Sequence, residues 1–207
     1  PAAIQVLCGT GNNGGDGFVM ADLAHKKGIP VTVVQVGTAD KIGGDALLAR
    51  QQALANGVSF EAFEQAHLSG DGVIVDALLG TGLGGEVRGT YVDAIAAINA
   101  SGAGVLAVDI PSGLCSDTGR VLGTAVRADL TVTFIGLKRG LFTLDAADHT
   151  GAVYFTDLAV PEEVYRQVAC DSYRLELEVQ LERLAPRPAN AHKGLYGTVL
   201  VVGGDYG

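Results

Sequence analysis

Residues 9–17 (GTGNNGGDG) are the stretch that decides the fold of this chain. They follow a short apolar run at residues 4–8 and precede a segment whose apolar residues recur at helical spacing as far as residue 26. This order predicts a strand, a glycine loop and a helix. Glycines let the backbone come close to a phosphate, and a helix N-terminus offers free N–H groups to it. The loop contains the pattern G-x-G-x-x-G, which is a weak signal for a dinucleotide-binding turn when it stands alone.

A second glycine loop repeats this arrangement further along the chain. Residues 80–89 (GTGLGGEVRG) stand between an apolar run at residues 72–79 and a helical pattern at residues 91–100. Two such loops are much harder to obtain by accident than one. Parallel strands deliver their loops to the same carboxyl edge of a sheet, so we expect both loops to meet around one crevice.

Strands and helices alternate along most of the chain. Six strands are predicted, at residues 4–8, 31–36, 72–79, 105–110, 130–135 and 152–155, and helices follow the first three. This alternation indicates right-handed βαβ units. Most of the strands are apolar without alternation, which predicts burial on both faces. We therefore expect an α/β fold, a three-layer αβα Rossmann-like sandwich with a mostly parallel central sheet.

The composition excludes several classes of protein. Glycine accounts for 30 of 207 residues and proline for only 6, without a Gly-X-Y period, so collagen and Pro/Gly-rich disorder are excluded. The formal net charge of −9 argues against nucleic acid or a membrane surface as a partner. No apolar run reaches the roughly 18 residues of a membrane span. Cys8, Cys115 and Cys170 have no C-x-x-C spacing, which favours free thiols and a cytoplasmic location.

Three regions are predicted along the chain. Residues 1–160 form the α/β domain, residues 161–190 form a polar linker, and residues 191–207 are the truncated start of a second domain with a strand at 198–202. The chain begins at Pro1 and enters a strand almost at once, so we expect a further segment upstream.

Several polar residues are predicted to lie at the crevice. They are Asn12, Asn13 and Asp16 from the first loop, Asp76 from the third predicted strand, and Asp109 and Ser112 from the fourth strand and its turn. A helix N-cap is the alternative role for Asp16. Asp76 is harder to explain structurally, because an acid in a strand buried on both faces is costly unless it is paired or bound to a cation.

The chemistry of these side chains favours some functions over others. They offer only oxygen ligands, which suit a monovalent or alkaline-earth cation and not zinc. The four histidines show no metal-binding spacing, and neither a G-x-S-x-G elbow nor a G-x-x-x-x-G-K-[ST] loop is present. Residues 35–37 (QVG) lack the acid that binds a ribose in an ordinary NAD-dependent dehydrogenase, which argues against that class.

Taken in order, GTGNNGGDG, DALLGTGLGG and AVDIPSG resemble the YjeF N-terminal domain family, the NAD(P)H-hydrate epimerases. The resemblance covers about residues 1–160, including FIGLKRGL and DLAVPEEVY, but the family's helix ahead of the first strand is missing. The segment HKGLYGTVLVVGGDYG resembles the opening of the ADP/ATP-dependent NAD(P)H-hydrate dehydratase domain, which has a ribokinase-like fold. Together the two parts are similar to bifunctional nicotinamide nucleotide repair proteins.

The resemblance implies an isomerase that interconverts the R and S forms of hydrated NADH or NADPH, so that an S-specific dehydratase can restore the cofactor. It implies K+ bound by Asn13, Asp76 and Ser112, ADP or ATP used only by the dehydratase domain, and a homo-oligomer. The substrate-binding residues carried over by motif are Asn12, Asn13, Gly14, Gly15, Asp16, Gly80, Thr81, Gly82, Leu83, Gly84, Gly85, Glu86 and Asp109.

The chemistry of such a substrate suggests a role for one carboxylate. The hydrated ring carbon bears a hydroxyl and the ring nitrogen, so inversion needs the hydroxyl protonated and lost as the nitrogen donates electrons, and then water returned to the opposite face. One acid/base carboxylate could serve both steps. Asp109 is our candidate because it ends a strand at the crevice, and Asp16 is the second. Lys138 could meet a phosphate or the developing charge, or could be an ordinary solvated lysine.

Two alternative functions stay open. A domain of this fold could keep its crevice as a non-catalytic nucleotide-binding or interaction module, although the joint presence of Asn13, Asp76, Asp109 and Ser112 favours the enzyme. An ordinary nucleotide-dependent oxidoreductase is the other alternative, and the missing acid after the second strand speaks against it.

Overall fold

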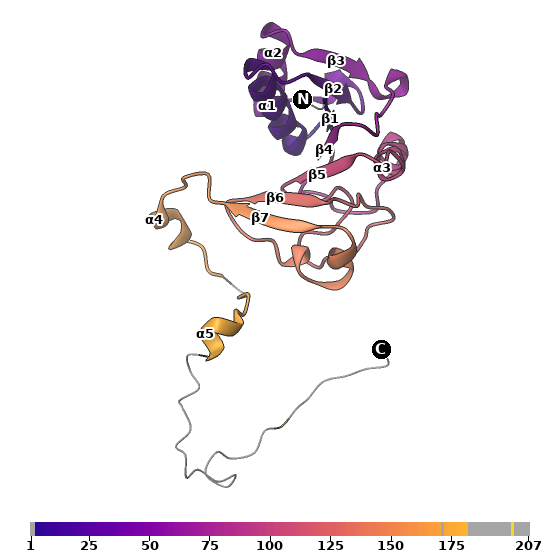
Figure 1. The fold of residues 1–207 in the computed structure, drawn as a ribbon. Coiled ribbons are helices and arrows are strands. Elements are labelled where there is room, and N and C mark those ends of the chain that lie inside the picture. The colour runs from indigo at the N-terminus through magenta and orange to yellow at the C-terminus, as the bar shows by residue number, and fades with distance from the viewer. Residues whose placement is uncertain (1–2, 171, 182–199, 201–207) are drawn as a thin grey trace, which may run out of the picture. The chain divides into compact units, whose positions relative to one another are not determined.

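The structure, a computed structural model, describes residues 3–170, 172–181 and 200 (Figure 1). The chain divides into two compact units, Pro1–Gln167 and Val168–Gly207. The second unit contributes the short helix α5 (Leu177–Leu181). The predicted strand at 198–202 and the predicted start of a second domain at 191–207 lie almost wholly outside the described residues.

A seven-stranded sheet forms the centre of the first unit (Figure 1). Its strands are β1 (Ile4–Cys8), β2 (Val31–Gln35), β3 (Ser59–Ala62), β4 (Val73–Ala77), β5 (Gly104–Val108), β6 (Leu130–Phe134) and β7 (Ala152–Thr156). They are ordered β3-β2-β1-β4-β5-β6-β7, and every neighbouring pair is parallel. The predicted Rossmann-like α/β class is therefore confirmed, with a sheet that is parallel throughout.

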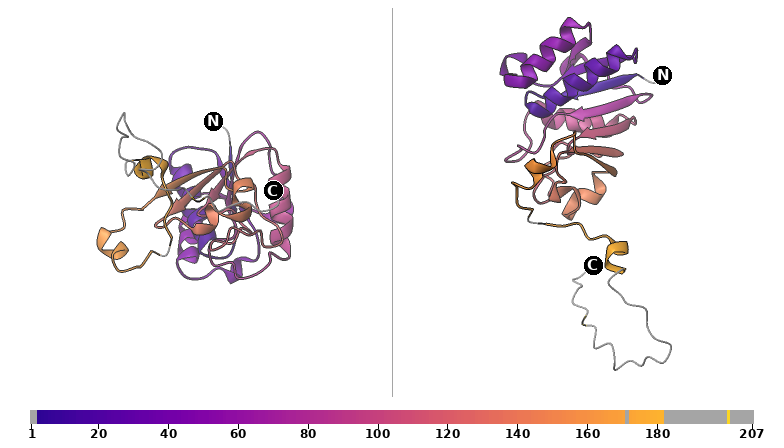
Figure 2. Two further views of the ribbon diagram at one scale, coloured as in Figure 1. Left: turned by 90° about the horizontal axis from the view of Figure 1, so that it is seen from below. Right: turned by 90° about the vertical axis from the view of Figure 1, so that its left-hand side faces the viewer.

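Helices cover both faces of the sheet. The α-helices of this unit are α1 (Asn12–Lys26), α2 (Gly44–Ala55), α3 (Thr90–Ala100) and the short α4 (Glu162–Tyr165). The 3-10 helices are η1 (Ala39–Lys41), η2 (Phe63–Gln65), η3 (Arg139–Leu141) and η4 (Leu144–Asp148). Helices α1 and α2 lie side by side on one face, and α3 lies on the other (Figures 1 and 2). None of the described helices is long and apolar enough to cross a membrane.

Successive residues of each central strand pack into different cores. Val6 of β1 lies in a buried cluster with Phe18 of α1, whereas the next residue, Leu7, lies in a cluster with Ile95 of α3. Burying side chains of this size stabilises the fold by about 1.5–3 kcal/mol each. This two-sided burial is what the uninterrupted apolar runs predict, because residues i and i+1 of a strand point to opposite faces.

The structure corrects three details of the sequence prediction. The strand β3 was not predicted, because its four residues (SFEA) are mostly exposed at the edge of the sheet and show little apolar pattern. The helix α1 begins at Asn12, so the second half of the predicted first loop is helical. The predicted strands at 72–79 and 105–110 are too long, since β4 ends at Ala77 and β5 ends at Val108.

The strand order creates a place for a ligand. From β1 the order proceeds to β2 and β3 on one side, and to β4 and β5 on the other. The helix α1, which follows β1, and the helix α3, which follows β4, lie on opposite faces of the sheet. A crevice opens outside the carboxyl ends of parallel strands at such a topological switch point.

Candidate functional site

A cavity of about 530 Å³ lies at this carboxyl edge of the sheet. It is lined by Thr10, Gly11, Asn12, Asn13, Asp16, Leu78, Leu79, Gly80, Thr81, Gly82, Leu83, Gly84, Tyr91 and Asp109. Its volume is in the range of small-molecule and cofactor sites. The titratable lining residues are two acids and a tyrosine, with no lysine, arginine or histidine.

Most of the predicted site residues line this cavity. They are Asn12, Asn13, Asp16, Gly80, Thr81, Gly82, Leu83, Gly84 and Asp109. The predicted residues Gly14, Gly15, Asp76, Gly85, Glu86 and Ser112 do not appear in its lining. A Cβ on Gly14 would overlap the backbone carbonyl of Gly9, and a Cβ on Gly15 would stand 3.0 Å from Ala46 of α2. These two glycines therefore let α1 pack closely against its surroundings.

The first turns of α1 carry Asn13 and Asp16 into the cavity wall. The N-cap of the helix is Gly11, so the alternative that Asp16 caps this helix is wrong. Asn13 is buried, and neither its amide oxygen nor its amide nitrogen has a hydrogen-bond partner. An unsatisfied buried polar group costs about 1–3 kcal/mol, which is typical of a side chain that awaits a ligand.

Asp76 is fully buried near the end of β4. Its Oδ1 accepts hydrogen bonds from the Ser112 hydroxyl (2.6 Å) and the Leu78 N–H (3.2 Å), and its Oδ2 accepts one from the Ser112 N–H (2.8 Å). Burial raises the pKa of Asp76 to about 6, although the bonds from Ser112 and Leu78 oppose this shift. These donors carry no charge, so they leave the charge of an ionised Asp76 uncompensated.

The oxygen-bearing side chains Asn13, Asp76 and Ser112 gather around residues 78–80. The Cβ of Asn13 lies 3.1 Å from where a Cβ of Gly80 would stand, and the Ser112 hydroxyl accepts a hydrogen bond from the Leu79 N–H (2.8 Å). The amide oxygen of Asn13 is unpartnered and the carboxylate of Asp76 is buried, so this oxygen set fits a potassium-like cation. Among the described residues, no group of three His, Cys, Asp or Glu side chains could hold a metal.

Asp109 stands directly after β5 in a strained turn. Its φ is 69°, and the Ile110 N–H donates to the Val108 carbonyl (2.8 Å), so Asp109 is the central residue of a γ-turn with positive φ. Such a backbone costs of order 1–3 kcal/mol and is typical of functional sites. Partial burial raises the pKa of Asp16, and the charge of Asp109 adds to this shift.

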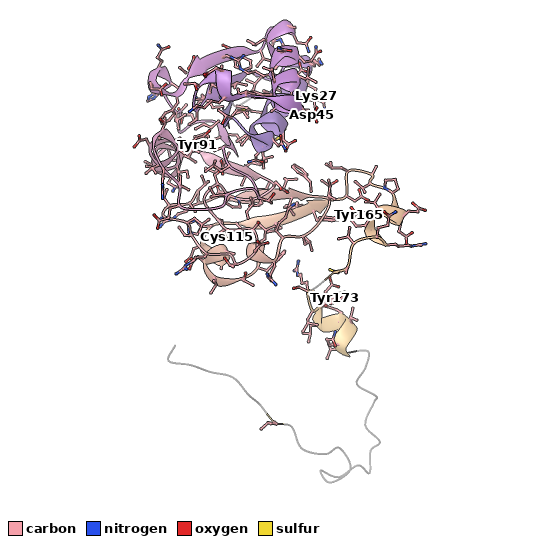
Figure 3. All side chains as sticks on the ribbon, turned by 180° about the vertical axis from the view of Figure 1, so that it is seen from behind. Lys27, Asp45, Tyr91, Cys115, Tyr165 and Tyr173 are labelled. Atoms are coloured by element: carbon pink, nitrogen blue, oxygen red, sulfur yellow. The ribbon has the colours of Figure 1, made fainter. Side chains whose placement is uncertain are left out.

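Tyr91 joins the two sides of the cavity and was not predicted from the sequence. It lies in the first turn of α3 (Figure 3), and its hydroxyl is 3.3 Å from the Thr10 backbone nitrogen and 3.2 Å from the Thr10 hydroxyl. The same hydroxyl stands 3.4 Å from where a Cβ of Gly37 would be. Tyr91 therefore lies next to residues 35–37, where a dehydrogenase would bind ribose.

The fold and the cavity define a doubly wound α/β domain with a candidate ligand site at its topological switch point. The chain belongs to the family described as YjeF-related protein N-terminus, which matches residues 1–140. It is 40% identical over 168 residues to an NAD(P)H-hydrate epimerase of Rhodopirellula baltica, covering 79% of this chain and 69% of that protein.

Longer relatives are named as bifunctional enzymes. A bifunctional NAD(P)H-hydrate repair enzyme Nnr of Coxiella burnetii is 48% identical over 204 residues, and that of Escherichia coli is 41% identical over 202 residues. The matches cover 99% and 98% of this chain but only 42% and 39% of those proteins. A crystal structure of the yeast protein ynu0 has a TM-score of 0.68 at 18% identity, covering 83% of this chain and 74% of the yeast chain. That likeness supports the fold alone.

Proposed function

We propose that this chain epimerises hydrated NADH and NADPH, interconverting their R and S forms. One observation carries the proposal: two carboxylates, Asp16 and Asp109, face a single cavity built from two glycine loops. The name of the Rhodopirellula baltica relative supports this reaction, and the names of the longer relatives suggest a longer protein that also repairs the hydrate. ADP or ATP would belong to that further activity, whose predicted start at 191–207 lies almost wholly outside the described residues.

In the proposed site, backbone N–H groups bind the substrate more than charged side chains do. The N-terminus of α1, with Gly11 as its N-cap, offers free N–H groups and a favourable dipole to a pyrophosphate. The residues of the second loop, from Gly80 to Gly84, line the opposite part of the cavity. Gly14, Gly15, Gly85 and Glu86 remain predicted binding residues on the strength of their motif alone.

The proposed chemistry assigns the proton transfers to Asp109, with Asp16 as the second candidate. The carboxyl group gives a proton to the hydroxyl of the hydrate, which leaves as water while the ring nitrogen supplies the electron pair. A water molecule then adds to the opposite face of the cationic ring and returns a proton to the same carboxylate, which restores the carboxyl group. Atoms and charge balance over the cycle, and the net change is inversion at one carbon.

We also propose that Asn13, Asp76 and Ser112 hold a potassium ion. The unpartnered Asn13 amide and the buried Asp76 carboxylate support this assignment. The ion would supply positive charge beside a cavity whose lining contains no cationic side chain. Asp76 and Ser112 themselves fix the course of residues 78–80 through the hydrogen bonds to Leu78 and Leu79.

We also propose a cytoplasmic location and a homo-oligomeric assembly for this chain. A cytoplasmic location is supported by the free thiols of Cys8, Cys115 and Cys170. A homo-oligomer is proposed on the family resemblance, and sedimentation velocity would measure it.

Epimerisation is tested with the R-hydrate of NADH and an S-specific dehydratase, following the recovery of NADH by absorbance. We expect the parent chain to accelerate recovery and Asp109→Asn to lose about 10²-fold or more, the usual scale of general acid–base catalysis. Asp45→Asn, an exposed acid at the start of α2 (Figure 3), is the matched control and should keep the parent rate. An inactive parent that still binds the hydrate would support the non-catalytic alternative, and full activity of Asp109→Asn would refute the assignment of Asp109.

Potassium is tested by exchanging it for tetramethylammonium and recording thermal unfolding as well as epimerisation. We expect K+ to raise the Tm of the parent chain, since a ligand at 100 times its Kd stabilises by about 2.7 kcal/mol. Asp76→Asn should abolish this dependence because it removes the charged oxygen ligand. An equal K+ effect on both proteins would show that the ion does not bind at Asp76.

A further inference from the structure

Lys138 lies beside Asp109 and does not appear in the lining of the cavity. Its side chain is only 17% exposed, unlike that of an ordinary solvated lysine. The ammonium group donates to Asp109 Oδ1, to the Thr133 hydroxyl (3.0 Å) and to the Phe134 carbonyl (2.8 Å). An ammonium has three N–H groups, so these acceptors use all of them and leave none for a substrate.

The two carboxylate oxygens of Asp109 are in different situations. Oδ1 accepts hydrogen bonds from Lys138, from the Thr133 hydroxyl (3.1 Å) and from the Phe134 N–H (3.1 Å). Within the part of the chain that the structure describes, no donor is assigned to Oδ2. Because Asp109 lines the cavity, Oδ2 is the oxygen left for a ligand.

A second γ-turn places Lys138 at this position. Ile135, directly after β6, has a φ of 63°, and the Gly136 N–H donates to the Phe134 carbonyl (2.6 Å). A β-branched residue with positive φ is a strained outlier. Ile135 is 48% exposed, so its own burial does not explain the strain. The turn does reverse the chain so that Lys138 returns to the Phe134 carbonyl and to Asp109.

We propose that Lys138 is a positioning residue for Asp109. Together with Thr133 and the Phe134 N–H it fixes Oδ1, so that Oδ2 faces the hydroxyl group on the reacting carbon in one orientation. The adjacent γ-turns at the ends of β5 and β6 hold the two charged partners against each other. The expected effect of Lys138 on the reaction rate rests on the proposed epimerase function. The fixed position of the Asp109 side chain does not depend on that function.

The kinetic test compares Lys138→Met and Lys138→Arg with the parent in the coupled epimerisation assay. We expect Lys138→Met to lower kcat by about 10²-fold, the scale of a misplaced catalytic group, while KM changes little. Lys138→Arg should recover part of the loss, because it keeps the charge but not the geometry of the ammonium. Lys27→Met, an exposed lysine after α1 (Figure 3), is the matched control and should match the parent. An unchanged kcat, or a loss carried by KM alone, would overturn the proposal.

A second measurement does not depend on any reaction. The Phe134 N–H donates to Asp109 Oδ1, so its hydrogen exchange reports whether Asp109 is held in place. We expect faster exchange of this amide in Lys138→Met and in Lys138→Arg than in the parent, with unchanged exchange in the buried strand β1. Equal Phe134 exchange in all three proteins would overturn the positioning role even if the parent proves inactive. An inactive parent with the expected exchange pattern would refute the epimerase alone.

Discussion

Asp16 and Asp109 place two negative charges in the wall of one cavity. Partial burial and the charge of Asp109 both raise the pKa of Asp16. The folded protein therefore binds the Asp16 proton more tightly than the unfolded chain does. Ionisation of Asp16 therefore lowers the free energy of unfolding. This loss grows as pH rises from the pKa of Asp16 in the unfolded chain through its higher pKa in the folded protein.

Replacing Asp16 by Asn should accordingly stabilise the chain at neutral pH. Below the unfolded pKa of about 3.9 the parent carries a neutral carboxyl, so the two proteins should have similar Tm values. The Tm of Asp16→Asn should exceed that of the parent by a growing margin as pH rises toward 7. The variant should also epimerise the hydrate more slowly than the parent. Thermal unfolding at several pH values measures this, and a parent more stable than the variant at pH 7 would contradict it.

Some of these side chains could be found in the sequence and others could not. Asp76 stands out because it is an acid inside an apolar run, a pattern that costs free energy without a partner. Tyr91 gives no such signal, since its contact with Thr10 spans 81 residues and depends on how α3 is placed over the loop. Lys138 is ambiguous in the sequence for the same reason: only the turn at Ile135 brings it to Asp109.

At the scale of elements, the two glycine loops look alike in sequence but differ in structure. In the first, a Cβ on Gly9, Gly14 or Gly17 would collide with neighbouring atoms, so these glycines permit close packing of α1 and the strands. In the second, a Cβ on Gly82 or Gly84 would meet nothing within 4 Å. Gly82 and Gly84 therefore leave open space beside the cavity.

This difference predicts opposite effects of the same substitution. Gly14→Ala should destabilise the chain by about 1–3 kcal/mol, because the new Cβ overlaps the Gly9 carbonyl and the backbone must shift. Gly82→Ala should change stability by less than about 0.5 kcal/mol. It should nevertheless raise KM for the hydrate, since its methyl group enters the cavity wall. Urea unfolding and the coupled assay separate the two cases, and a destabilised Gly82→Ala would contradict this view of the loops.

The helix and strand pattern shows the limits of local sequence signals. Residues 12–17 were predicted as loop because glycine and asparagine are poor helix formers. In the structure they begin α1, since the missing side chains let this turn fit against Gly9 and α2. The central strands were predicted because their burial on both faces leaves continuous apolar runs, whereas the exposed edge strand β3 leaves none.

At the scale of the whole molecule, every cavity-lining residue and Lys138 belong to the unit Pro1–Gln167. The chain spans about two fifths of the length of its bifunctional relatives. The predicted boundary at residue 160 and the predicted linker to 190 stay predictions. A doubly wound sheet with its own cores is expected to fold without the residues that follow it.

Deleting Val168–Gly207 should therefore leave the site working. We expect the shortened chain to unfold with the Tm of the full chain and to keep its epimerisation rate, because the residues that line the cavity are all retained. Circular dichroism and the coupled assay measure both quantities. A large loss of Tm or of activity would show that the second unit takes part in the fold or the site.

The position of β1 also has a consequence for how the protein is made. This strand lies in the middle of the sheet between β2 and β4, and Ile4 pairs in register with Val73. At a synthesis rate of about 5–20 residues per second, β1 waits roughly 3–14 s on the ribosome before its second neighbour exists. Until then β1 has a strand, β2, on one side only, so one edge of the apolar IQVLC segment is open to chaperones and to misassembly during that interval.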